Sequence, residues 1–412
     1  MATSRDPESM PFFLRTSIGF YLLATALGLV LRIFFVAPFG HLVFANALHA
    51  HSHTLYFGWG ALGIFALAFR RLGAEGRASK AVLGAIAAIA AATFVSFLLS
   101  GYSPPSIAIS SLSLGVWGWA AATIWRRSRG STDLDVSFLR AGIVYLVLAS
   151  LGALTRVALI ALQAPTFYKS LAVFAFLHDF AWFFVLSVVG LLIERARAHG
   201  LHLDERLLRW QLRLSVPLAW LTFPLGVAGG ANGLLGTIAS VAAIALVVPA
   251  GLGATALWRA GASAPRGGLG AAFRWLAIWL ALEAVLSAAG GLGLAGLAVH
   301  SRHLAILYLH VLLLGFVTLG LMVSTLSVLG GPLSAGSWLH NGGLSIMALG
   351  LAAAGLPAFG LELAPLVPRL GLIVAAFGGA VVIAGGIAWS VGAWRSAAKG
   401  EERASLALHG PL

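Results

Sequence analysis

The sequence contains no cysteine, only 13 acidic residues and only four methionines among 412 positions. Without cysteine, disulfide bonds, thiolate metal sites and the C-x-x-C-H attachment of c-type heme are excluded. Charged residues make up 9% of the chain and hydrophobic residues 60%, which excludes a water-soluble globular protein. The scarcity of methionine is unlike a copper-relay protein, which uses soft thioether ligands.

Long hydrophobic runs recur from one end of the chain to the other. A helix of about 20 apolar residues crosses the hydrocarbon core of a bilayer, and backbone groups in lipid need partners within their own segment. We therefore expect an all-α, polytopic integral membrane protein with one transmembrane domain over residues 1–412. The twelve predicted spans are 12–36, 47–69, 81–100, 105–125, 138–161, 170–193, 212–231, 234–257, 274–296, 303–330, 341–357 and 367–394.

The basic residues predict how the chain is oriented. With the N-terminus in the cytoplasm, all but five of the 26 lysines and arginines fall on the cytoplasmic side, as the positive-inside rule requires. The C-terminus is then cytoplasmic too. Because the positive charge lies in short loops between spans, it predicts contact with lipid headgroups and no nucleic-acid partner. The five outer residues are Arg32, Arg156, Lys169, Arg302 and Arg369.

Histidines cluster inside the predicted spans. The string LHAHSHTLYFGWG places three at the start of the second span, FLHDFAWFF places one in the sixth, and RHLAILYLHVLLLGF places two in the tenth. Imidazole is costly in a membrane unless something binds it, which predicts a metal or heme site. The candidate metal ligands are His49, His51, His53, His178, His303 and His310.

Depth and helical face narrow these candidates. At 1.5 Å per residue, His53, His178 and His310 all lie roughly 9–12 Å below the outer edge of the bilayer. On an ideal helix His49 and His53 share a face, and His51 points nearly the opposite way. His303 and His310 lie on one stripe of the tenth span. Single histidines near helix ends are interpreted as interfacial residues, namely His41, His199, His202, His300, His340 and His409.

Other charged residues accompany the histidines. Arg32, Arg156 and Arg302 lie at the outer ends of three spans, where they hold the carboxylates of a heme or another anion, or contact lipid headgroups. Asp179 either orients the neighbouring imidazole or pairs with a basic residue. Glu283 is the deepest carboxylate and is either a proton relay or a neutral, hydrogen-bonded group; the second is favoured.

These residues carry a family resemblance. Twelve spans with histidines on the second, sixth and tenth resemble catalytic subunit I of the heme-copper oxidases and nitric oxide reductases. The string HAHSHTLYFGW is also similar to the HAHExxFGF-type signature of the NnrS family, and to an H-S-H-x-x-x-x-G-W motif in oxidase-subunit-I-like proteins. The resemblance implies a multi-pass protein of the bacterial inner (cytoplasmic) membrane that binds heme and iron.

The chain also departs from the oxidase pattern. Oxidases complete their copper site with two adjacent histidines on the seventh span, and 212–231 contains none. A tyrosine normally follows four residues after the sixth-span histidine, where this chain has Trp182. The two tenth-span histidines of an oxidase are separated by one residue and lie on opposite faces, unlike His303 and His310. The usual oxygen-reducing heme-copper centre is therefore incomplete, and catalytic residues are not assigned.

The resemblance then implies b-type heme held by two histidines, with copper as a second metal. The implied heme-binding residues are His49 or His53 of the second span, His310 of the tenth, and Arg32 and Arg302. His178 holds a second metal or lines the site. The leading hypothesis is electron transfer, or binding or metabolism of nitric oxide or oxygen as an oxidoreductase, with electrons from a redox partner or a quinol. The alternatives are histidine-based copper or zinc transport, and a non-catalytic assembly partner of a respiratory complex.

Overall fold

A computed structural model describes the chain apart from residues 1–8, 227–232, 266, 295–300, 362–363 and 409–412. Two histidines interpreted as interfacial, His300 and His409, lie outside the described residues. Every regular element in the described ranges is a helix. In chain order the elements are α1 (Ser9–Val36), α2 (Phe44–His53), η1 (Thr54–Ala61), α3 (Leu62–Arg71), α4 (Arg77–Ser100), α5 (Pro104–Ser128), α6 (Leu134–Ala161), α7 (Thr166–Ala198), α8 (Glu205–Thr222), η2 (Phe223–Gly226), α9 (Gly233–Ala245), α10 (Val247–Ser263), α11 (Gly268–Ala289), η3 (Gly290–Leu294), α13 (Arg302–His310), η4 (Val311–Thr318), α14 (Leu319–Leu329), α15 (Ser334–Gly355), η5 (Leu356–Phe359) and α16 (Leu366–Leu408).

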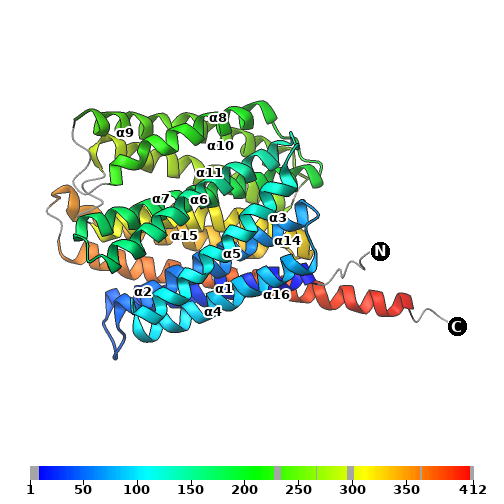
Figure 1. Ribbon diagram of the computed structural model, residues 1–412, viewed down its shortest axis with the longest axis horizontal. Coiled ribbons are helices and arrows are strands. Elements are labelled where there is room, and N and C mark those ends of the chain that lie inside the picture. The colour runs from blue at the N-terminus through cyan, green and yellow to red at the C-terminus, as the bar shows by residue number, and fades with distance from the viewer. Residues whose placement is uncertain (1–8, 227–232, 266, 295–300, 362–363, 409–412) are drawn as a thin grey trace.

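The helices run side by side in one bundle, and the all-α membrane architecture is confirmed (Figure 1). Eleven helices among the described residues are long and apolar enough to cross a membrane, and each coincides with a predicted span. The seventh predicted span, 212–231, is not among these eleven: it covers part of α8 and η2, and its residues 227–231 lie outside the described residues. Helix α8 is shorter and charged along its first half, but it packs lengthwise against α10 and α9 (Figure 1).

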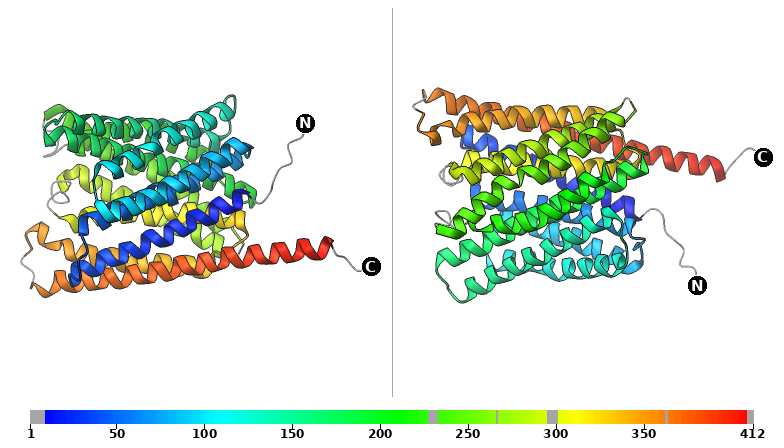
Figure 2. Two further views of the ribbon diagram at one scale, coloured as in Figure 1. Left: turned by 60° about the horizontal axis from the view of Figure 1, so that its bottom comes forward. Right: turned by 90° about the horizontal axis from the view of Figure 1, so that it is seen from above.

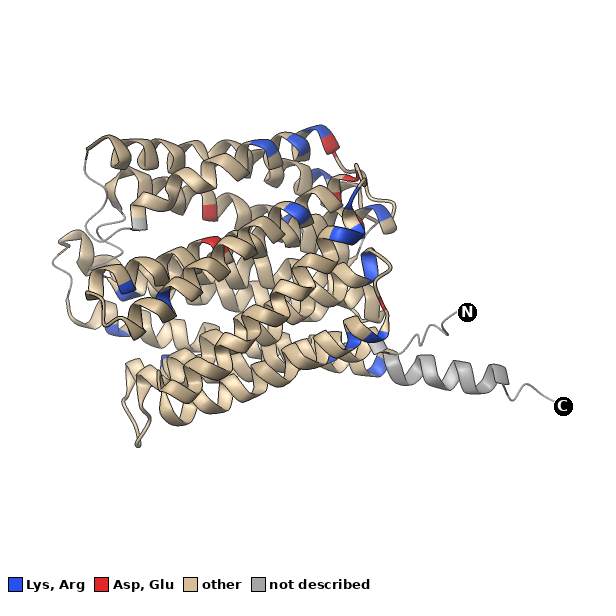
Figure 3. Cartoon of the chain, in the orientation of Figure 1, with Lys and Arg blue, Asp and Glu red and all other residues tan. Residues whose placement is uncertain are grey.

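The charges lie mainly at one end of this bundle. Figure 3 shows lysine and arginine gathered at the end where both chain termini lie, with few at the other end. Five of the six exposed tryptophans lie near the same end, as in the aromatic belt of a membrane protein; they are Trp125, Trp210, Trp258, Trp338 and Trp394. The sixth, Trp220, lies in the last turn of α8, toward the other end. The sequence analysis predicts that this end faces the cytoplasm; it is called the charged end below, and the opposite end is called the outer end.

Glycine allows the last two spans to pack closely. Three glycines spaced seven residues apart on α15 face three with the same spacing on α16, namely Gly336, Gly343 and Gly350 against Gly371, Gly378 and Gly385. A Cβ atom added to Gly378 would lie 2.4 Å from the backbone nitrogen of Met347, so the two backbones touch. Small residues of this kind drive helix association in lipid, where burial of apolar side chains gives little gain. Helix α16 also lies along α1, as Figure 2 shows.

The bundle has three central spans. In Phe44–Arg71, Thr166–Ala198 and Arg302–Leu329, 67–78% of the most apolar stretch is buried in protein, against 39% or less in the other eight. These three spans carry all six histidines proposed as metal ligands. The histidine-bearing spans are therefore the most enclosed spans of the bundle, while the six histidine side chains themselves are partly buried.

An ion-pair cluster ties three spans together at the charged end of the bundle. Asp135 at the start of α6 is buried, and its two carboxylate oxygens accept hydrogen bonds from Arg71 of α3 at 2.6 Å and Arg197 of α7 at 2.8 Å. Arg71 also pairs with Asp133 at 2.8 Å, but Asp133 is half exposed. Arg197 continues the cluster to Glu205 of α8 at 2.5 Å, and this hydrogen bond lowers the pKa of Glu205.

We expect Asp135→Asn to lower the free energy of unfolding by about 2–3 kcal/mol, because it leaves two arginines without their shared carboxylate. The loss is smaller than for a fully buried pair because the guanidinium groups are partly exposed and screened. Thermal unfolding in detergent measures it. Asp133→Asn is the matched control, with a loss below about 1 kcal/mol. Equal losses in the two variants would show that Asp135 does not hold the cluster.

Candidate functional site

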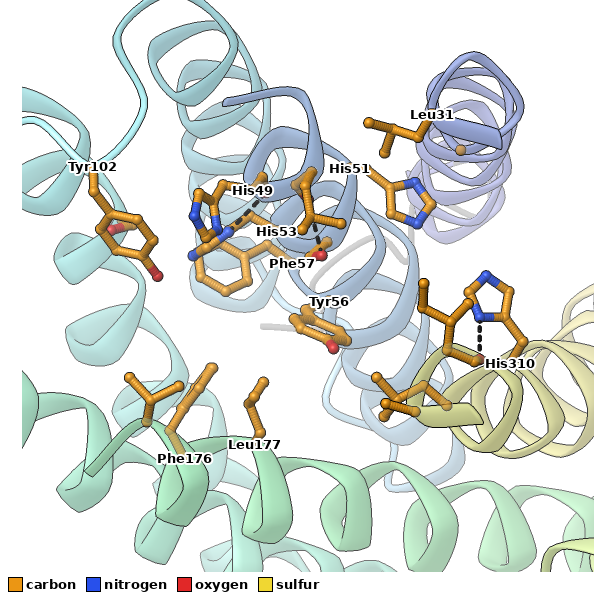
Figure 4. A pocket seen from close by; sticks show the side chains of 18 of the residues that line it. Leu31, His49, His51, His53, Tyr56, Phe57, Tyr102, Phe176, Leu177 and His310 are labelled. Atoms are coloured by element: carbon orange, nitrogen blue, oxygen red, sulfur yellow. Dashed lines mark hydrogen bonds between the residues drawn. The ribbon is translucent and has the colours of Figure 1, made fainter. Parts of the chain in front are cut away.

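A cavity of about 670 Å³ lies between the central spans, toward their outer ends. Its lining comes from α1, α2, η1, α5, α6, α7 and α13, with further contacts from η4, α15 and α16, and is mainly apolar. The polar side chains include four of the candidate histidines and three arginines, and we call the cavity the histidine pocket (Figure 4). These residues are His49, His51, His53, His310, Arg32, Arg156 and Arg302.

His51 is held by helix α1. Its Nδ1–H donates to the backbone carbonyl of Ala24 at 2.8 Å, because a carbonyl can only accept. Its Nε2 has no hydrogen-bond partner among the described side chains and backbone groups. The ring lies against Gly28, where an added Cβ would come within 2.8 Å of the imidazole Cε1. The absence of a side chain at Gly28 therefore leaves the space that the His51 ring occupies between α1 and α2.

His310 is held in the same way by its own helix. Its Nδ1–H donates to the carbonyl of Ile306 at 2.7 Å, one turn earlier in α13. Its Nε2 lies 3.2 Å from Nη2 of Arg32 and must accept, because a guanidinium has no acceptor. Both contacts assign the same tautomer, with the proton on Nδ1 and the lone pair on Nε2. This is the tautomer in which an imidazole binds a metal through Nε2.

His49 and His53 lie at the other end of the pocket. The Nδ1–H of His53 donates to the carbonyl of His49 at 2.9 Å, and its ring stacks on Phe97 at 4.3 Å between centroids. The ring of His49 packs edge-on against Tyr102 at 4.4 Å. Figure 4 shows these two rings near Tyr102, whereas His51 lies on the side of His310.

The predicted directions of the three histidines on the second span are therefore confirmed. The histidine that lies nearest His310 differs from the one expected. His49 and His53 share a face, and His51 points away from them, as the helical repeat predicts. The face on which His51 lies is the one turned toward α1 and α13. The structure brings His51, and not His49 or His53, to the same side of the pocket as His310.

His178 does not line the pocket, although its depth matches that of His53 and His310. Phe176 and Leu177 face the pocket, and the next residue of the helix is turned about 100° away, toward α8. There His178 bonds Asp179 at 2.9 Å and Thr222 of α8 at 3.1 Å. Asp179 thus contacts the neighbouring imidazole, which was one of its two predicted roles.

His303 also lies outside the pocket lining and packs edge-on against Phe35 at 5.8 Å. No three histidine, aspartate or glutamate side chains in the described part of the chain lie close enough together to hold a metal ion. The structure therefore divides the six candidates. Four line one pocket, and two, His178 and His303, make separate contacts.

The arginines make the pocket positively charged. Arg32 is only 7% exposed, and its Nη1 has no hydrogen-bond partner. The Nε of Arg156 is likewise buried without a partner, and Arg302 lies over the ring of Phe35 at 5.6 Å. The described lining contains no aspartate or glutamate to neutralise them. Unpartnered, buried guanidinium donors in an apolar pocket favour a ligand that carries an anionic group.

A π-helical segment follows each of the two histidine segments directly. η1 begins after His53, and η4 begins after His310. The segments are joined by the indole N–H of Trp59, which donates to the hydroxyl of Thr318 at 3.1 Å. Such segments are rare and occur frequently at functional sites. Hydropathy and helical period contain no signal for them, so the sequence did not predict them.

His340 was predicted to be interfacial, and this prediction is wrong. The side chain is fully buried, its Nδ1 accepts from the hydroxyl of Tyr21 at 3.1 Å, and its Nε2–H donates to the carbonyl of Leu314 at 3.0 Å. Helix α15 begins at Ser334, seven residues before the predicted span, which places His340 inside the helix. Its bonds join α1, α15 and η4. The described histidines at 41, 199 and 202 are exposed, as predicted.

The pocket thus combines two histidines of fixed tautomer, two more at its far end, and unpaired arginine donors in apolar surroundings. No protein family model matches this sequence, and no curated protein is significantly similar to it.

Proposed function

We propose that this membrane protein binds b-type heme in the histidine pocket, and that His51 and His310 would hold it. The observation that carries the proposal is that both imidazoles donate Nδ1–H to a backbone carbonyl and present Nε2 on the same side of the pocket. A backbone partner on Nδ1 is the usual orienting contact of a metal-bound histidine. Bound heme would supply reversible one-electron chemistry or a binding place for a diatomic gas.

The residues present fit this group. The cavity of about 670 Å³ lies within the roughly 300–1,000 Å³ of ligand pockets, and its walls are mainly apolar. Heme also carries two carboxylates, which need cationic partners in a membrane. Arg32, Arg156 and Arg302 supply these at the outer end of the pocket, and two of them have unpartnered nitrogens. Arg32 would exchange its bond to His310 for a carboxylate.

A heme held by two histidines would favour electron transfer. Electrons would come from a redox partner or from a quinol in the bilayer, since the chain contains no C-x-x-C-H motif for a c-type heme of its own. Binding of nitric oxide or oxygen would be the alternative chemistry of such a site. We place the protein in the bacterial inner membrane, with the resemblance to oxidase subunit I and NnrS proteins as support.

The optical spectrum of the purified protein, oxidised and reduced, tests the proposal directly. We expect near-stoichiometric heme by the pyridine hemochrome assay, sharp reduced bands and no shift on adding carbon monoxide. His51→Ala and His310→Ala should each lower heme content more than about tenfold, because even the outer partners of metal ligands contribute about 10–100-fold. His178→Ala, outside the pocket, is the control and should keep its heme.

Unchanged heme in His310→Ala would contradict the assignment. A carbon monoxide shift in the unaltered protein would mean one open position and a gas-binding role. If the protein is colourless and binds copper or zinc, the metal-transport hypothesis would replace the heme proposal. If it binds neither heme nor metal, the assembly-partner hypothesis would remain.

Arg32→Gln tests the anion site separately from the ligands. A charge-assisted hydrogen bond contributes about 1.5–3 kcal/mol, so we expect heme to bind roughly 10–100-fold more weakly. Transfer of heme to apomyoglobin measures the change. Arg369→Gln is the matched control, because Arg369 is also on the outer side but is exposed and does not line the pocket. Equal weakening in both variants would point to a general effect of surface charge.

Gly28→Ala tests the position of His51 without removing a ligand. The added methyl group would lie 2.8 Å from Cε1 of His51 and must push the ring away, so heme content should fall. Gly19→Ala on the same helix meets nothing within 4 Å and should keep its heme. Gly19→Ala should unfold at or above the temperature of the unaltered protein, since alanine favours helix over glycine. Full heme in Gly28→Ala would remove His51 as a ligand.

A further inference from the structure

A carboxyl group lies inside the membrane-spanning part of α11, away from the histidine pocket. Glu283 belongs to the span Gly268–Gly293 and does not line the pocket. Its Oε1 accepts a hydrogen bond from the hydroxyl of Ser287, one turn later, at 2.7 Å. It accepts a second from the hydroxyl of Tyr308 on α13 at 3.3 Å. The two hydroxyls lie 3.4 Å apart and complete a small polar cluster.

The cluster contains no positive charge. Among the described residues, the groups that act on Glu283 are Ser287 and Tyr308, and Tyr308 is the only titratable one. Two other buried carboxylates of the described residues do have a basic neighbour: Asp135 pairs with two arginines, and Asp179 bonds His178. An isolated carboxylate inside a bilayer is far more costly than the neutral acid.

We propose that Glu283, with Ser287 and Tyr308, is a proton-binding site inside the membrane. Both hydroxyl donors are on Oε1, which leaves Oε2 to carry the proton. When the proton leaves Oε2 for water or another base, the same two hydroxyls stabilise the carboxylate that remains. The cluster therefore supports both forms of the group, which a purely apolar pocket would not do.

The site shares a helix with the histidine pocket. Tyr308 and His310 are two residues apart on α13, so their side chains leave the helix on nearly opposite sides. Tyr308 points to Glu283, whereas His310 and Arg302 line the pocket. Loss or gain of the proton changes the hydrogen bond that fixes α13 to α11. The contacts that form this proton site do not involve the histidine pocket, so the proposal does not depend on heme binding there.

Dicyclohexylcarbodiimide, an apolar reagent for protonated carboxyl groups in membranes, tests the site. We expect the full-length protein in lipid nanodiscs to form an adduct on Glu283 at neutral pH, found by peptide mass spectrometry, and the yield to fall as pH rises. Glu283→Gln should remove the adduct. Glu205 is the internal control: its hydrogen bond from Arg197 lowers its pKa, so it stays ionised and should not react.

Tyr308→Phe sharpens the test. The tyrosine hydroxyl stabilises the ionised form of Glu283, so its removal should let the adduct form up to a higher pH. An infrared difference spectrum of the unaltered protein minus Glu283→Gln at neutral pH should also show the carbonyl band of a protonated carboxyl group. If the spectrum lacks this band and Glu283 forms no adduct, Glu283 is ionised at neutral pH, which would overturn the proposal. An adduct that disappears at lower pH in Tyr308→Phe would also overturn it.

Discussion

Polar side chains inside a bilayer must find their partners within the protein, and this constraint decides what each histidine in the chain can do. His51, His53 and His310 each place Nδ1–H on a backbone carbonyl. That bond satisfies one nitrogen, fixes the tautomer and leaves the other nitrogen as an acceptor. His340 has both nitrogens bonded within the protein and therefore has none left for a ligand. The same residue type is a candidate ligand in one place and a structural link in another.

The arginines must also find partners within the protein, and they do so at one end of the bundle but not at the other. At the charged end, Arg71 and Arg197 share the buried carboxylate of Asp135, and the cluster holds helices together. At the outer end, Arg32 and Arg156 keep buried nitrogens without partners beside the histidine pocket. A protein that only needed stability would pair or remove these charges, because an uncompensated buried charge is destabilising. This is the reason why we propose an anionic ligand as their partner.

The sequence predicted the spans well because crossing a bilayer depends on length and composition, which can be read directly. It predicted that His49 and His53 share a face because the helical repeat fixes angles within one helix. It could not predict which face of one helix meets which face of another, since that depends on packing of the whole bundle. For this reason His178 matched the other histidines in depth but turns toward Thr222, and His51 lies on the side of His310.

The π-helical segments η1 and η4 connect these observations. Each widens the helix immediately after a pocket histidine, and the bond from Trp59 to Thr318 joins them at the centre of the bundle. Glycine permits close contact at both, because Gly58 lies against Phe20 and Gly315 lies against Trp279. The two histidine-bearing helices are thus fixed to each other below the pocket, and the pocket lies above that junction. A ligand that needs groups from both helices at a fixed separation would find them held in place, which reduces the cost of ordering them on binding.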